Sequence, residues 1–320
     1  MSYSELEPDI IPADAEPVRV QGRTPFQLAW SRFRRDRLAV ASIAVLALMV
    51  LFAALAPVWA SWTGHPYDQT FPKTGLDPDG LPKGPSGDFW LGADQLGRDV
   101  LVRSAYGARI SLVVGVCAAV LASIAGVLVG TLAGFVGGVL DTVLARLMDI
   151  TLALPYLLVA IMLATTFQIS SVGASLTMTI LVIAFFSFAA FGRIIRGQVM
   201  SLKQKEFVEA ARSLGASNVR IMLVDVLPNL VAQVTVLTSL LIPTSIVFEA
   251  TLSFLGVGVR LPMPSWGSML GEGSDVFQTA WWLLIVPGVL LLLTTLSFNL
   301  LGDGIRDALD PRGDRVAGRK

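Results

Sequence analysis

Very few side chains in this sequence could carry out covalent, metal or phosphate chemistry. The chain of 320 residues has one cysteine, Cys117, and one histidine, His65. Cys117 lies deep in an apolar run, so a Cys–His pair is not expected, and a lone histidine cannot supply a multi-histidine metal site. No Gly-Lys dipeptide occurs, so the chain lacks the Walker A loop that holds ATP phosphates. The sequence therefore predicts no catalytic, metal-binding or cofactor-binding residue, and any energy source must lie in another subunit.

The most informative pattern of charged and apolar residues lies in residues 193–228. Four apolar residues at i, i+3, i+4 and i+7 predict one face of a helix: Phe207, Ala210, Ala211 and Leu214. Charged residues surround that face: Lys203, Glu206, Glu209 and Arg212. Gly215 is typical of the residue after a helix end, and Ser217 of an N-cap that starts a second helix. The second helix has its own apolar face, made of Val219, Met222, Leu223 and Val226. Pro228 marks the end of that helix or a kink into the next segment.

The segments that flank this helix pair are long enough to cross a membrane. Hydrophobic residues make up 54% of the chain and charged residues only 15%, which excludes a single soluble globular domain. Five charge-free stretches each exceed the roughly 20 residues of a membrane-spanning helix: residues 38–60, 110–140, 150–192, 226–248 and 276–302. The third stretch is interrupted by polar and turn-forming residues between Thr165 and Gly173, so we divide it into two spans. The sequence predicts an all-α integral membrane protein with six transmembrane helices.

The distribution of lysine and arginine predicts the orientation of these spans. With a cytoplasmic amino terminus, the inner segments hold 18 of the 24 basic residues and the outer segments hold six. The positive-inside rule therefore favours cytoplasmic positions for both termini and for residues 193–228. The first stretch is longer than the apolar core of about 7–15 residues in a cleavable signal, so we expect it to remain as an anchor.

Three functions fit a helix pair held on the cytoplasmic face between two spans. It could be an interfacial pair that lies on lipid, a DNA-binding helix-turn-helix, or a docking surface for a cytoplasmic protein. The 24 basic and 24 acidic residues give no net charge, and the membrane tethers the pair at both ends. Both features argue against a nucleic-acid partner.

The motif Glu209-Ala-Ala-Arg-Ser-Leu-Gly215, followed by Leu227-Pro228, resembles the EAA loop of binding-protein-dependent ABC importer permeases. The family pattern is Glu-Ala-Ala, three residues, Gly, nine residues, Ile, one residue and Leu-Pro. The chain departs from it at Asp225, where Ile is usual, and its ending continues as Leu-Pro-Asn229, a variation similar to the peptide-permease branch. Three further segments resemble the peptide and nickel branch: residues 90–99, residues 252–258 with 265–267, and residues 298–304 with 310–312.

The resemblance implies a type I ABC importer permease fold and a division into regions. Residues 24–60 resemble the leader of the second (C-type) permease subunit of dipeptide and oligopeptide systems. We expect a disordered tail at 1–22, the leader and first span at 23–60, and an extracytoplasmic loop at 61–105. The permease domain would cover 109–302, with five spans and the coupling loop at 193–228, and a cytoplasmic tail would cover 303–320.

The resemblance also implies partners and a transport function in the bacterial inner membrane. The expected partners are a homologous permease, two ABC ATPases that bind ATP and magnesium, an extracytoplasmic binding protein, and membrane lipid. Together they would import di- or oligopeptides. Within the family, nickel or another small chelate is the alternative substrate, and outside it the alternative is a channel or secondary transporter. In this chain the resemblance assigns the ATPase-coupling role to Glu209, Ala210, Ala211, Gly215, Leu227 and Pro228.

Charged residues near the outer ends of the spans suggest further roles. Glu249 and Arg260 are candidates for an outer gate, although they could pair with each other, and Glu249 could snorkel to the interface. The outer arginines could contact a binding protein or a peptide carboxylate, or pair with Asp94 and Asp99; they are Arg98, Arg103 and Arg109.

Two further patterns bear on packing in the membrane. Glycines recur every four residues from Gly126 to Gly138, which predicts a face for close helix packing within the chain or between subunits. Trp281 and Trp282 are predicted to anchor the last span at the outer interface.

Overall fold

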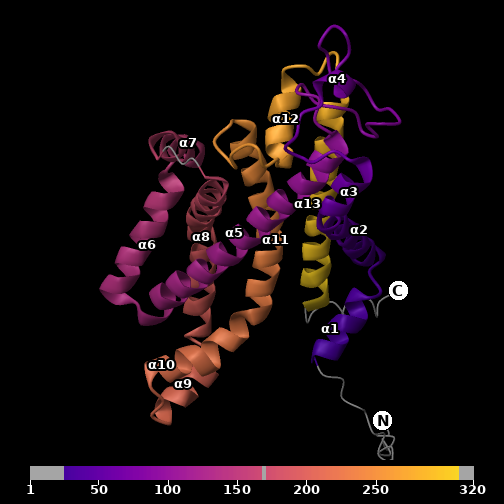
Figure 1. The fold of residues 1–320 in the computed structure, drawn as a ribbon. Helices are drawn as coiled ribbons and strands as arrows, with labels where there is room; N and C mark the ends of the chain where they lie inside the picture. The colour runs from indigo at the N-terminus through magenta and orange to yellow at the C-terminus, as the bar shows by residue number, and fades with distance from the viewer. Residues whose placement is uncertain (1–24, 168–170, 310–320) are drawn as a thin grey trace, which may run out of the picture.

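The computed structural model describes residues 25–167 and 171–309, and within these ranges it contains helices and turns but no strand (Figure 1). The predicted tail at residues 1–22 lies outside the described residues, as do residues 310–320. The helices in the first half of the chain are α1 (Pro25–Phe33), α2 (Arg37–Ala54), α3 (Ala56–Thr63), α4 (Pro72–Gly75), α5 (Val100–Val136), α6 (Gly138–Ala153) and α7 (Tyr156–Thr166). Those in the second half are α8 (Val172–Leu202), α9 (Glu206–Ser213), α10 (Asn218–Arg220), the π-helical turn η1 (Ile221–Val226), α11 (Leu227–Phe254), α12 (Trp266–Ser274) and α13 (Trp282–Leu309).

Five of these elements are long and apolar enough to cross a membrane. They are α2, α5, α8, the continuous helix from Asn218 to Phe254, and α13. A sixth crossing is formed if α6 and α7 are taken together as one span, although the two helices are bent by 84° relative to each other. The all-α membrane fold is therefore confirmed for the described part of the chain, with five spans, or the predicted six if the bent pair is counted as one.

The boundaries of the third span were predicted wrongly. We expected the span to begin at Ile150, but helix α6 begins at Gly138 directly after α5. Gly137 and Gly138 have φ angles of +76° and +63°, so the chain reverses direction within two residues that carry no side chain. Pro155 then separates α6 from α7, because proline disfavours a helical conformation at Leu154 and supplies no N–H donor.

The first predicted span, residues 38–60, is also divided. Helix α2 begins after Asp36, whose carboxylate accepts hydrogen bonds from the N–H groups of Leu38 and Ala39 at 2.9 and 3.2 Å. It ends at Ala54, and Pro57 lies in the first turn of the separate helix α3. The anchor is thus a membrane helix followed by a short second helix.

The glycine face of α5 packs within the chain. A Cβ atom on Gly126 would lie 2.8 Å from the ring of Phe191, and one on Gly134 would lie 2.7 Å from the carbonyl oxygen of Arg196. A Cβ atom on Gly130 would likewise lie too close to the backbone of Gly192. The absence of side chains at these three glycines therefore allows α5 and α8 to approach closely. Gly138 meets no atom within 4 Å and is not part of this face. Of the two partners considered for this face, the structure places α8 of the same chain against it.

Ion pairs join α6 to α8. Arg196 binds Asp141 through two hydrogen bonds, one of them 2.8 Å long, and Arg193 binds Asp149. The broken span is thereby held to the core formed by α5 and α8.

The described ends of the chain and the α9–α10 pair lie on the same side of the helix bundle. Figure 1 shows α1, α9, α10 and the end of α13 at the bottom, and α4, α7 and α12 at the top. Helix α2 packs against α13 and α5 at the edge of the bundle. This arrangement places the predicted coupling loop and the predicted outer segments at opposite ends of the spans.

Candidate functional site

Helix α9 presents an apolar face that no other part of the described chain covers. Val208 is fully buried against the cluster that also contains Ile221 and Val226, which fixes the orientation of α9. Leu214 is 88% exposed and Phe207 40% exposed, and Ala210 is exposed between them. These three residues lie at i, i+3 and i+7, on the side of α9 that faces away from the spans.

The apolar face predicted for this first helix of the pair is therefore only partly correct. Ala211 packs inward with Val208, whereas Phe207, Ala210 and Leu214 point outward. The spacing alone could not divide the four residues between two faces, because Ala210 and Ala211 are neighbours in sequence and helix rotation depends on the packing of Val208. Glu209 is exposed in the first turn of α9, and no described residue pairs with its carboxylate.

Gly215 ends α9 with the geometry predicted from the sequence. Its φ angle is +80°, and a Cβ atom there would meet nothing within 4 Å. The N–H of Ala216 donates to the carbonyl of Ala211 at 3.0 Å, and the N–H of Gly215 donates to that of Arg212 at 2.9 Å. This pair of bonds is the Schellman motif, which satisfies the free carbonyls at a helix end. The tight glycine turn between two helices is confirmed.

The second helix differs from the prediction in its buried face. Ser217 caps the helix as expected, with its hydroxyl accepting from the N–H of Arg220 at 3.4 Å. Ile221 and Val226 are fully buried, five residues apart, because they lie on a π-helical turn. Val219 and Leu223 are exposed, so the predicted face was wrong for these two residues.

Leu227 and Pro228 begin α11 directly after the π-helical turn. Pro228 has no N–H, so it cannot form the backbone hydrogen bond that a continuous α-helix would require at this point. The side-chain amide of Asn229 donates to the carbonyl of Asp225 at 2.6 Å. The proline therefore alters the helix geometry, without ending the helix, where α10 leads into the membrane span.

At the other end of the molecule, four charged residues form an ion cluster, in which three side chains are buried and that of Glu272 is 26% exposed. Arg98 binds Asp94 at 2.6 Å and Glu272 at 2.8 Å, and Arg103 binds Glu272 at 2.9 Å and Asp94 at 3.3 Å. The side chains of Arg98, Arg103 and Asp94 are 8%, 1% and 4% exposed. Pairing with Asp94 is confirmed, but Glu272 on α12 was missed because no local signal connects it with residues about 170 positions earlier.

The other predicted outer pairs are different in the structure. Asp99 caps α5 through the N–H groups of Leu101 and Val102, and it binds the imidazole of His65 at 3.0 Å instead of an arginine. The guanidinium of Arg109 donates to the carbonyls of Ala53 and Ala54, at the end of α2.

The predicted outer loop also binds one of the two predicted anchor tryptophans. Trp282 is 6% exposed, and its indole N–H donates to the carbonyl of Ala93 at 3.0 Å. The prediction of interface anchoring was wrong for Trp282, which holds the loop against α13. Trp281 is 57% exposed.

Glu249 is fully buried, which contradicts the snorkelling interpretation. Its carboxylate accepts hydrogen bonds from the hydroxyls of Ser111 on α5 and Ser253 on α11, both at 2.7 Å. The backbone N–H of Trp266 donates to the Ser111 hydroxyl at 3.4 Å. Within the described residues no ion pair joins Glu249 to Arg260. Through the hydrogen bonds of Ser111, Glu249 instead connects α11 with α5 and with the start of α12.

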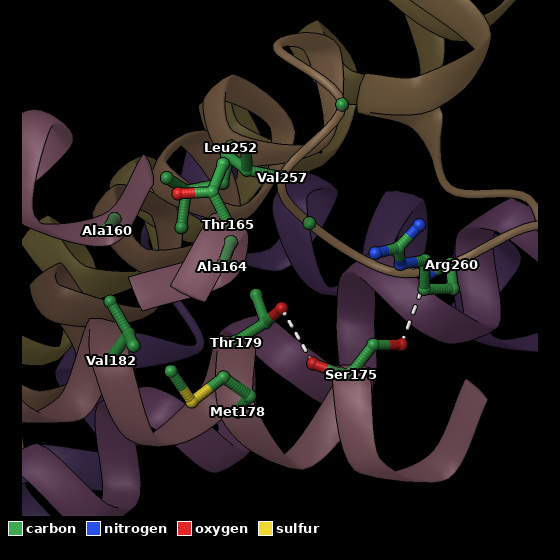
Figure 2. Close-up of a pocket in the computed structure, with 12 residues that line it drawn as sticks. Ala160, Ala164, Thr165, Ser175, Met178, Thr179, Val182, Leu252, Val257 and Arg260 are labelled. Atoms are coloured by element: carbon green, nitrogen blue, oxygen red, sulfur yellow. Dashed lines mark hydrogen bonds between the residues drawn. The ribbon is translucent and has the colours of Figure 1, made fainter. Parts of the chain in front are cut away.

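Arg260 lies in the loop between α11 and α12, beside a cavity of about 220 Å³. Figure 2 shows the cavity between Thr165 and Ala164 of α7, Thr179 and Met178 of α8, and the loop that carries Arg260. The backbone N–H of Arg260 donates to the hydroxyl of Ser175 at 3.1 Å (Figure 2).

These features define a class of protein: a multi-pass helical membrane protein with an exposed helical loop at one end of its spans and a sequence without a Walker A motif. Residues 126–315 match the family model of the binding-protein-dependent transport system inner membrane component. Residues 24–78 match that of the N-terminal transmembrane domain of oligopeptide transport permease C. The chain belongs to the family of binding-protein-dependent transport system inner membrane components.

Relatives with assigned names cover nearly the whole chain. The oligopeptide transport system permease protein OppC of Escherichia coli K12 is 42% identical over 312 residues, which are 98% of this chain and 99% of OppC. The glutathione transport system permease protein GsiD of Shigella flexneri is 42% identical over 292 residues, which are 91% and 92% of the two chains. A solved structure of the MetNI methionine ABC transporter in inward-facing conformations shares the fold, with a TM-score of 0.54 and 16% identity over 64% of this chain and 94% of that chain.

Proposed function

We propose that this chain is a permease subunit of an ATP-driven importer for di- and oligopeptides. It would pair with a homologous permease to form the passage, and a binding protein would deliver the peptide from outside. The names of OppC and GsiD support a peptide substrate, because both proteins are permeases for peptides or for glutathione, itself a small peptide. ATP and magnesium would be bound by two partner ATPases, because this chain has no Walker A loop.

The observation that carries this proposal is the exposed face of α9 beside Gly215. Phe207, Ala210 and Leu214 form an uncovered apolar face, and the free carboxylate of Glu209 lies next to it. Such a surface fits a groove on a partner that has a basic residue at its edge. We assign the coupling role to Glu209, Ala210, Ala211, Gly215, Leu227 and Pro228. The inward side of α9, through Val208 and Ala211, would pass the movement of the ATPases to α11.

The importer test requires the complete complex. The chain, its homologous permease, the two ATPases and the binding protein should together import a labelled peptide into proteoliposomes when ATP is supplied. The chain reconstituted alone should neither bind nor hydrolyse ATP. Peptide uptake without ATP would favour a channel or secondary transporter, and ATP turnover by the chain alone would contradict the assignment as a permease subunit.

We further propose that α9 and the described chain ends face the cytoplasm. This orientation follows from the 18 of 24 basic residues on that side, and it leaves the ion cluster and the cavity facing outward. The permease domain would then cover 109–302, after the outer loop at 61–105. Glu249 and Arg260 are candidates for a gate at the outer end.

Reporter fusions test the orientation directly. A reporter that is active only in the cytoplasm should work when fused after Arg196, near the start of the coupling loop, and fail when fused after Pro82 in the outer loop. Fusion after Leu309, at the end of α13, should also give an active reporter. Activity at Pro82 would reverse the proposed orientation.

A further inference from the structure

The cavity beside Arg260 is of a size and composition suited to one end of an extended ligand. Its volume of about 220 Å³ is below the roughly 300–1,000 Å³ of sites that enclose a whole drug-sized molecule. Most of its lining is apolar, including Met178, Val182, Leu252 and Val257. The hydroxyl-bearing residues Thr165, Ser175 and Thr179 supply its uncharged polar groups (Figure 2). A cavity with these properties can accept a single apolar side chain next to a polar end group.

Arg260 is the charged residue among those that line this cavity, and its guanidinium has no carboxylate partner in the described chain. The hydrogen bond from its backbone N–H to Ser175 fixes the loop against α8, so the side chain starts from a defined position at the cavity. Arg260 is exposed, and Figure 2 shows its guanidinium on the opposite side of the cavity from Thr165. An arginine in this situation offers two parallel N–H donors to a carboxylate.

The acidic residues on the neighbouring helices are already engaged. Glu272 lines a second pocket together with Arg260, but its carboxylate binds Arg98 and Arg103. Glu249 binds the hydroxyls of Ser111 and Ser253. The positive charge of Arg260 is therefore left available for a carboxylate that comes from outside the chain.

We propose that Arg260 binds the carboxyl-terminal carboxylate of a peptide in transit, while the last side chain of that peptide occupies the cavity between α7, α8 and the loop of residues 256–260. This site rests on the proposed function as a peptide importer. Every unmodified linear peptide carries a terminal carboxylate, so a site of this kind serves peptides of different sequence. An acidic side chain has the same chemistry, and the test below separates the two sources.

The test compares uptake of three labelled peptides by the reconstituted complex. The first has a free carboxyl terminus, the second is its carboxyl-terminal amide, and the third is an amide that ends in glutamate. The concentration of each is adjusted until the isolated binding protein is equally loaded, so that differences report the permease. In Arg260→Gln we expect uptake of the free acid to fall about tenfold, in line with the loss of a charge-assisted hydrogen bond, while uptake of both amides stays unchanged. Arg260→Lys should retain part of the uptake, because it keeps the charge but not the paired donors.

Two controls address general effects of charge and cavity shape. Lys83→Gln removes an exposed positive charge from the outer loop away from the cavity and should leave the ratio of acid to amide uptake unchanged. Ala164→Leu reduces the cavity and should slow peptides that end in phenylalanine more than peptides that end in glycine. The amount of assembled complex is measured for every variant, so that uptake is expressed per complex.

The outcomes separate this site from the proposed function. If the unsubstituted complex imports peptides but Arg260→Gln lowers acid and amide uptake equally, the carboxylate site is wrong and the importer function stands. If uptake of the glutamate amide falls and that of the free acid does not, the assignment to the carboxyl terminus is wrong. If the unsubstituted complex imports no peptide, the proposed function fails and the site fails with it.

Discussion

Replacing Gly215 with valine is expected to abolish binding-protein-stimulated ATP hydrolysis, while the chain remains in the membrane and paired with its homologous permease. The φ angle of +80° costs an ordinary L-residue about 1–2 kcal/mol, and a β-branched side chain disfavours it further. Because the site is open, with nothing within 4 Å of a Cβ atom, the substitution changes the turn without a clash inside the bundle. We expect at least a tenfold loss of stimulated hydrolysis and reduced co-purification of the ATPases.

Gly215→Asn is the matched control for the backbone conformation. Asparagine adopts positive φ more readily than other residues with a side chain, so this variant should retain most of the coupling. Loss of coupling in both variants would indicate that the ATPase contacts the glycine surface itself. Wild-type hydrolysis and co-purification in Gly215→Val, at equal membrane abundance, would show that this loop does not couple the ATPases.

Charge reversal on α9 tests the same surface independently. Glu209→Lys should release the ATPases because it places a cation against the expected basic residue of the partner, whereas Glu206→Lys reverses an exposed charge in the same turn outside the motif. An interfacial helix pair that only rests on lipid would tolerate both changes equally. A difference between the two variants therefore distinguishes docking from lipid contact.

Replacing Arg103 with methionine is expected to lower the free energy of unfolding by about 3–5 kcal/mol. The substitution removes a side chain that is 1% exposed and leaves Asp94 and Glu272 with Arg98 as their remaining partner. Removing one member of a buried group of ion pairs has a cost of this size because two carboxylates are left with a single arginine, which gives the site an excess negative charge. The measurement is the thermal unfolding midpoint of the purified complex in detergent.

Arg109→Met provides the control for this cluster. Arg109 donates to the carbonyls of Ala53 and Ala54 and has no ion pair among the described residues, so its loss should cost on the order of 1 kcal/mol. In the double variant Arg103→Met with Asp94→Asn, the excess negative charge left by the first substitution is removed and part of the stability should return. Equal midpoints for Arg103→Met and Arg109→Met would contradict a stabilising role of the buried cluster.

The sequence predicted features that depend on residues close together in the chain. Gly215 and Ser217 identified the turn and the second helix, because the αL conformation and the N-cap each require a particular residue type. The apolar runs predicted the spans for a similar reason, since a membrane helix satisfies its backbone hydrogen bonds within one segment. The family resemblance of residues 209–229 was confirmed by the family match over 126–315.

The features that were missed depend on tertiary packing. The outward face of α9 is decided by the burial of Val208 against Ile221, which the spacing within α9 does not reveal. Glu272 was not identified as the partner of Arg98 and Arg103 because it lies on a distant helix. The break at Pro155 did have a local signal, since proline disfavours helix at the preceding residue. The prediction of spans relied on the charge-free stretch that contains Pro155 and therefore placed this proline inside a span.

The break between α6 and α7 has a consequence for how the chain can exist in a bilayer. Sixteen residues of α6 rise by about 24 Å, which is less than the roughly 30 Å of hydrocarbon, so α6 alone does not cross a bilayer. At the break Pro155 supplies no donor for the carbonyl of Thr151, and residues 152–155 are exposed on the outside of the bundle. Lipid tails cannot hydrogen-bond a backbone group, so this side of the chain must be met by another protein surface or by water. Pairing with a second permease subunit would cover this stretch of backbone, so the break marks a side of the chain where a partner subunit is expected to pack.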